Sequence, residues 1–96
     1  DVAKAFYGIS LESIEKYVNK EFEPSQISAE LGVEIDNIIQ RNIVVDWHSN
    51  VIVQNKMRQE IDDYLFSLKD IHSIDLPIEE HDIIIEKSIE IAKHRY

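Results

Sequence analysis

The sequence predicts a small all-α protein, a bundle of four to five helices with no significant sheet. Three observations favour this fold class. Apolar residues recur every three or four positions along most of the chain, which is the helical period. Only two glycines and two prolines interrupt the 96 residues. No apolar run exceeds three residues, so nothing predicts a membrane span or a signal peptide.

Length and composition limit the possible functions. Ninety-six residues predict a single helical domain, 1–96. The formal net charge of −9 argues against phosphate-backbone binding by this domain alone, because such binding uses clustered lysines and arginines. The absence of cysteine excludes disulfides and thiolate chemistry and suits a reducing cytoplasm. Because the chain starts at Asp1 inside an expected helix, we expect a C-terminal fragment of a longer chain.

Three helices are expected in the first half of the chain. The first ends at Gly8, since glycine favours the position after a helix C-terminus. Ser10 caps a second helix that runs to about Lys20. Ser25 caps a third helix, which is interrupted at Gly32 and is expected to bury Ile27, Leu31, Ile35, Ile38 and Ile39.

The third helix also allows a different interpretation. Residues 27–33 resemble the first helix and turn of a helix-turn-helix, with Gly32 in the turn. The second helix would then bring Glu34 toward the DNA phosphates, and only Arg41 would compensate for the resulting repulsion. We therefore expect a kinked core helix or a helix pair used for packing, and a DNA-contacting module remains the alternative.

The central stretch predicts a helix over 51–68, capped by Ser49 or Asn50. Its expected buried stripe consists of Met57, Ile61, Tyr64, Leu65 and Leu68. Trp47, the one tryptophan, stands just before the helix, where its indole is expected to cover the first turn. Asp46 either contacts a partner or, as we favour, accepts backbone N–H bonds at the start of this helix.

A loop over 69–76 with two apolar anchors, Ile71 and Ile74, leads to a last helix opened by Pro77. That helix carries more apolar surface than one stripe needs. One face contains Ile78, Ile85, Ile89, Ala92 and Tyr96, and a second contains Ile84 and Ile91. Either the helix is central in the bundle, or the second stripe contacts something outside the chain.

No catalytic, cofactor-binding or metal-binding residue is expected. The two glycines lie too far apart for a phosphate-binding loop. The four histidines are widely separated, at His48, His72, His81 and His94. Neighbouring carboxylates such as Asp62 with Asp63, or Glu79 with Glu80, point about 100° apart on a helix, so they are expected to form a solvated face or to oppose the helix dipole.

Several segments resemble the extreme C-terminal region of the R subunits of type I restriction enzymes. The central ones read VDW at 45–47, VQNKMR at 53–58 and IDDYL at 61–65. The outer ones read AKAFYG at 3–8, IDL at 74–76 and IAKHRY at 91–96. The resemblance covers nearly the whole chain.

The resemblance implies a helical assembly domain of the subunit that translocates and cleaves DNA. The parent would be an ATP-dependent type I site-specific deoxyribonuclease of the cytoplasm, with ATP and Mg bound by upstream domains. The partner would be the methyltransferase and specificity subunits or the motor of the same chain, and DNA would be contacted by the parent complex. The candidate partner-binding residues are Trp47, Ile84, Ile91 and Tyr96. A free-standing acidic regulatory bundle is a further alternative.

Overall fold

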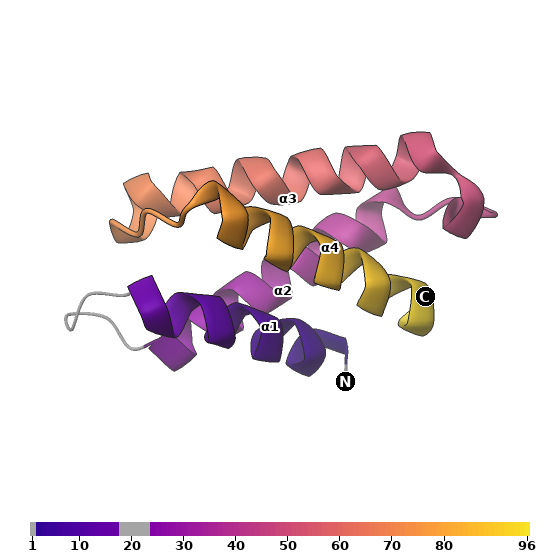
Figure 1. The fold of residues 1–96 in the computed structure, drawn as a ribbon. Helices are drawn as coiled ribbons and strands as arrows, with labels where there is room; N and C mark the ends of the chain where they lie inside the picture. Colours follow the sequence, from indigo (N-terminus) through magenta and orange to yellow (C-terminus); the bar gives the residue numbers. More distant parts are fainter. Residues whose placement is uncertain (1, 18–23) are drawn as a thin grey trace.

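The protein is all-α, as the sequence predicts. A computed structural model describes residues 2–17 and 24–96, and no strand occurs within those ranges. The elements shown in Figure 1 are α1 (Val2–Tyr17), α2 (Pro24–Asn42), the short 3₁₀ helix η1 (Trp47–Ser49), α3 (Val51–His72) and α4 (Ile78–Arg95).

The four long helices form an elongated bundle. Helix α1 packs against α2 and α4, and α3 likewise packs against α2 and α4. In Figure 1, α3 and α1 lie along opposite edges, with α4 crossing in front and α2 behind. The principal extents are 43 × 24 × 19 Å. The turn that contains η1 lies at one end of the long axis, and the turn between α3 and α4 lies at the other (Figure 1).

Helix α1 is continuous, so the break expected at Gly8 and the cap expected at Ser10 are wrong. Gly8 does not adopt the positive φ of a left-handed helix end. The hydroxyl of Ser10 instead donates to the carbonyl of Phe6 at 2.8 Å, within the helix. A glycine inside a helix costs about 1 kcal/mol, and burial of Phe6 and Ile14 on either side offsets that cost. Lys20, the expected end, lies outside the described residues.

Helix α2 begins at Pro24, so Ser25 lies inside the helix and the cap expected there is wrong. The helix continues without a break through Gly32. The helix pair and the helix-turn-helix turn at Gly32 are therefore wrong, and α2 is a single core helix. All five predicted core residues are buried: Ile27, Leu31, Ile35, Ile38 and Ile39. Burial of each aliphatic side chain stabilises the fold by about 1.5–3 kcal/mol, which outweighs the helix-propensity cost of a glycine in the helix interior.

The start and buried face of α3 agree with the prediction. The side chain of Asn50 accepts a hydrogen bond from the backbone N–H of Val53 at 3.2 Å, so Asn50 is the N-cap. The fully buried members of the predicted stripe are Met57, Ile61, Leu65 and Leu68, and Tyr64 packs against them partly buried. These buried side chains of α3 pack into the core against α2 and α4.

Helix α3 ends later than expected, at His72. Ser73 has a φ of 57°, and the N–H of Ile74 donates to the carbonyl of Leu68 at 3.1 Å, which closes the helix end. Because the helix extends past it, Ile71 is turned outward and is 61% exposed, so its predicted role as a loop anchor is wrong. Ile74, only 2% exposed, is the anchor that was predicted correctly.

Helix α4 follows Pro77 directly, as predicted, and lies between α1 and α3. Its contacts on both sides explain why it carries apolar residues over so much of its circumference. Ile85, Ile89 and Ala92 are buried as expected, whereas Ile78 and Tyr96 are 59% and 39% exposed because they lie at the helix ends. The helix is therefore central in the bundle.

Candidate docking surface

Backbone and side-chain hydrogen bonds fix the turn between α2 and α3, which we call the corner (residues 43–50). The N–H of Trp47 donates to the carbonyl of Val44 at 3.2 Å, and that of Asn50 to the carbonyl of Trp47 at 3.0 Å. From α3, the amide of Gln54 reaches back and donates to the carbonyls of Trp47 and His48 at 3.0 and 2.8 Å. Gln54 is itself buried. The corner is thus anchored to the first turn of α3.

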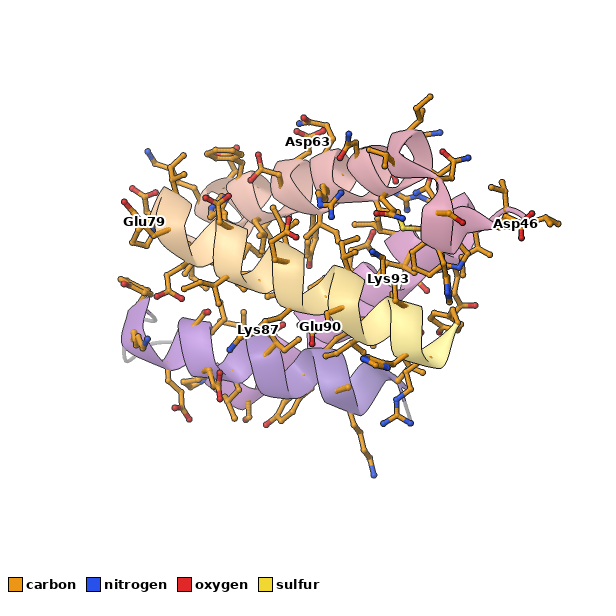
Figure 2. All side chains as sticks on the ribbon, turned by 45° about the vertical axis from the view of Figure 1, so that its right-hand side comes forward. Asp46, Asp63, Glu79, Lys87, Glu90 and Lys93 are labelled. Atoms are coloured by element: carbon orange, nitrogen blue, oxygen red, sulfur yellow. The ribbon has the colours of Figure 1, made fainter. Side chains whose placement is uncertain are left out.

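Asp46 occupies the outer tip of the corner (Figure 2). Its φ of 63° is in the left-handed region, which aspartate tolerates better than most residues. Its side chain makes no capping hydrogen bond, so the favoured prediction that this carboxylate accepts backbone N–H groups is wrong. Asn50 performs the capping instead. The carboxylate of Asp46 is exposed and remains available to another group.

Four β-branched aliphatic side chains are exposed around the corner, and we call them the corner patch. They are Val44, Val45, Val51 and Ile52, with exposed fractions of 49, 88, 62 and 83%. Val45, Val51 and Ile52 line one surface hollow of about 500 Å³. Val44 and Val45 line a neighbouring hollow of about 380 Å³, so the four side chains form one surface. Contiguous exposed apolar surface of this kind marks contact sites.

Two of the predicted partner-binding residues, Trp47 and Tyr96, line the smaller of these hollows together. Trp47 is 3% exposed, and its indole nitrogen has no hydrogen-bond acceptor among the described residues. The hydroxyl of Tyr96 donates to the carboxylate of Asp36 on α2. Burial, with this hydrogen bond, raises the pKa of Tyr96 to about 12. Binding by either residue remains a prediction.

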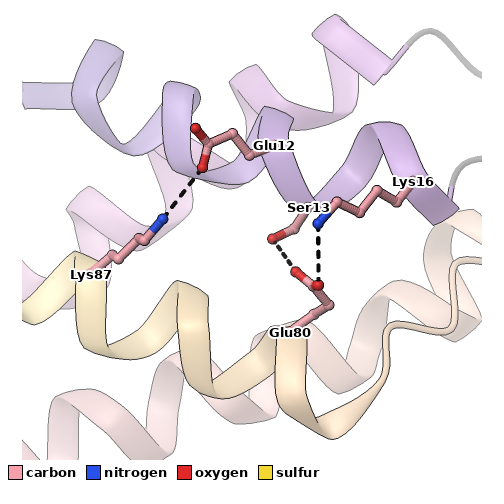
Figure 3. Close-up of polar contacts among 5 residues, drawn as sticks. All are labelled: Glu12, Ser13, Lys16, Glu80 and Lys87. Carbon is pink, nitrogen blue, oxygen red and sulfur yellow. Dashed lines mark hydrogen bonds and ion pairs between the residues drawn. The ribbon is translucent and has the colours of Figure 1, made fainter.

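The other two predicted partner-binding residues lie elsewhere. Ile84 is 0% exposed, and Ile91 is half-buried against the core. Positions 80, 84, 87 and 91 form one stripe of α4, and both charged members of this stripe contact α1: Glu80 meets Ser13 and Lys87 meets Glu12 (Figure 3). The stripe therefore faces α1, and the predicted outward position of Ile84 is wrong.

Glu80 was expected to lie on a solvated face or to oppose the helix dipole; it lies in the first turn of α4 but is only 8% exposed, so it is not on a solvated face. Its carboxylate accepts a hydrogen bond of 2.7 Å from the hydroxyl of Ser13 and lies 3.7 Å from the ammonium of Lys16 (Figure 3). The spacing in the sequence could have indicated this burial, because Glu80 lies four residues before Ile84 and therefore on the same stripe of the helix. These contacts tie the start of α4 to α1.

His81 ties the same turn of α4 to α3. It is 1% exposed, and its Nδ1 lies 2.8 Å from a carboxylate oxygen of Asp62. The ring of Phe66 meets the imidazole edge to face, with centroids 4.6 Å apart. No signal in the sequence pairs two residues nineteen positions apart. Since Glu80 and His81 are adjacent, one turn of α4 is bonded to both neighbouring helices.

No family model, curated protein or solved structure matches this chain. Within the described ranges, no helix is long and apolar enough to cross a membrane.

Charged side chains elsewhere in the described residues form ion pairs within and between helices. No group of three or more histidine or carboxylate side chains converges there in a way that could hold a metal ion. Arg41, on which the DNA-contacting alternative depends, lies 3.7 Å from a carboxylate oxygen of Glu34 and 3.5 Å from one of Glu60. Arg58 pairs in the same way with Glu86 at 2.9 Å.

Proposed function

We propose that this chain is the C-terminal helical assembly domain of the R subunit of a type I restriction enzyme, and that its corner patch docks this subunit onto the methyltransferase–specificity core. The observation that carries the proposal is the position of the patch. It surrounds the segment 45–47, one of the segments through which the sequence resembles that family, and it exposes four aliphatic side chains there.

The construction of the corner supports a contact function. Gln54 and Asn50 hold its backbone by hydrogen bonds before any partner arrives. A surface ordered in advance loses little conformational entropy on binding, so more of the apolar burial appears as affinity. Val45 and Ile52, the most exposed members, would supply the desolvated centre of such a contact.

The charge of the domain fits the same role. With a net charge of −9, it is not suited to hold DNA by its own surface, and it would leave DNA to the motor and nuclease domains of the parent chain. ATP and Mg would likewise be bound upstream. What remains for the domain is to position those activities on the complex.

The test places Val45→Asp and Ile52→Asp separately in the full R subunit and measures its binding to the methyltransferase–specificity complex by titration calorimetry. We expect each variant to bind at least about tenfold more weakly, because a charge replaces an apolar side chain at the centre of the contact. The control is Ile71→Asp, which changes an isoleucine of α3 that lies beyond the corner and is also exposed, at 61%. Circular dichroism of each variant verifies that the helices are retained.

Three results would overturn the proposal. Unchanged binding of both corner variants would show that the patch is not the docking surface. If binding is unchanged and the ATPase activity of the isolated R subunit falls instead, the patch contacts the motor of its own chain. If Ile71→Asp loses as much binding as the corner variants do, the effect is not specific to the corner patch.

A further inference from the structure

We draw no further inference here: the strongest candidate, the surface hollow of about 350 Å³ between α3 and α4 beside the exposed side chain of Ile78, carries none, because Arg58 in its lining already pairs with Glu86 and nothing in the structure shows what covers it.

Discussion

Replacing Ile84 by alanine measures whether the second apolar stripe of α4 is packed or free. Ile84 is 0% exposed and lies on the stripe that faces α1. Truncating a fully buried isoleucine to alanine costs about 2–5 kcal/mol, which combines lost burial with the cavity left behind. Since α1 is held close to α4 by Ser13 and Glu80, the site cannot collapse freely, and we expect about 3–4 kcal/mol.

The neighbouring residue provides the control. Ile83 is the same residue type in the same helix but is 43% exposed. About half of the 1.5–3 kcal/mol available from burying an isoleucine is lost on its truncation, and the higher helix propensity of alanine returns about 0.4 kcal/mol. Ile83→Ala should therefore cost about 0.5–1 kcal/mol. The gain in helix propensity is common to both variants and cancels in the comparison.

Urea unfolding followed by far-ultraviolet circular dichroism provides the measurement. Small domains lose about 1–3 kcal/mol of stability per molar urea, so Ile84→Ala should lower the midpoint by about 1–4 M, and Ile83→Ala by less than about 1 M. Equal midpoints for the two variants would refute the packing assignment and would make Ile84 a candidate external contact again. A changed slope for either variant would show that its effect is not on stability alone.

Two further predictions use the same unfolding assay. Ser13→Ala should lower the free energy of unfolding by about 1–3 kcal/mol, because it removes the hydrogen-bond donor to buried Glu80. Ser88→Ala should lower it by less than about 0.5 kcal/mol, because no hydrogen-bond partner of the Ser88 hydroxyl occurs among the described residues. Equal losses in the two variants would contradict this assignment. The pKa of Tyr96 is raised from 10.0 to about 12, so its contribution to stability is complete below pH 10 and is lost as the pH rises through 12. Tyr96→Phe should accordingly be less stable than the parent below pH 10, with a difference that shrinks toward pH 12; a difference independent of pH would show that the hydroxyl does not titrate as described.

The amphipathic parts of the fold could be predicted because their causes are local. The spacing of apolar residues in α2 and α3 decides which face is buried, and Asn50 caps α3 through a bond to a residue three positions away. The errors came where distant packing overrode a local preference. Gly8 and Gly32 favour helix ends, yet burial of the residues on both sides keeps each helix intact.

The candidate site could be predicted only in part. Trp47 and Tyr96 were chosen for their positions in the sequence, but nothing in it indicates that residues 49 positions apart share one hollow. The corner patch itself was missed, because a β-branched pair such as Val44 and Val45 usually predicts a strand or a core position. Exposure depends on the absence of a neighbouring element, which a pattern of residues does not encode.

Packing within the chain explains the additional apolar residues of α4 but not those of the corner. Packing against α1 and α3 accounts for Ile84 and its neighbours, so folding alone explains why they are apolar. No contact within the described chain accounts for Val45 and Ile52, which keep most of their surface in water. Each such side chain forgoes about 1.5–3 kcal/mol of burial and adds a risk of aggregation. Exposed apolar side chains that adjoin one another mark contact surfaces more often than single ones do, and this is why the corner, rather than the stripe on α4, is the surface to test first.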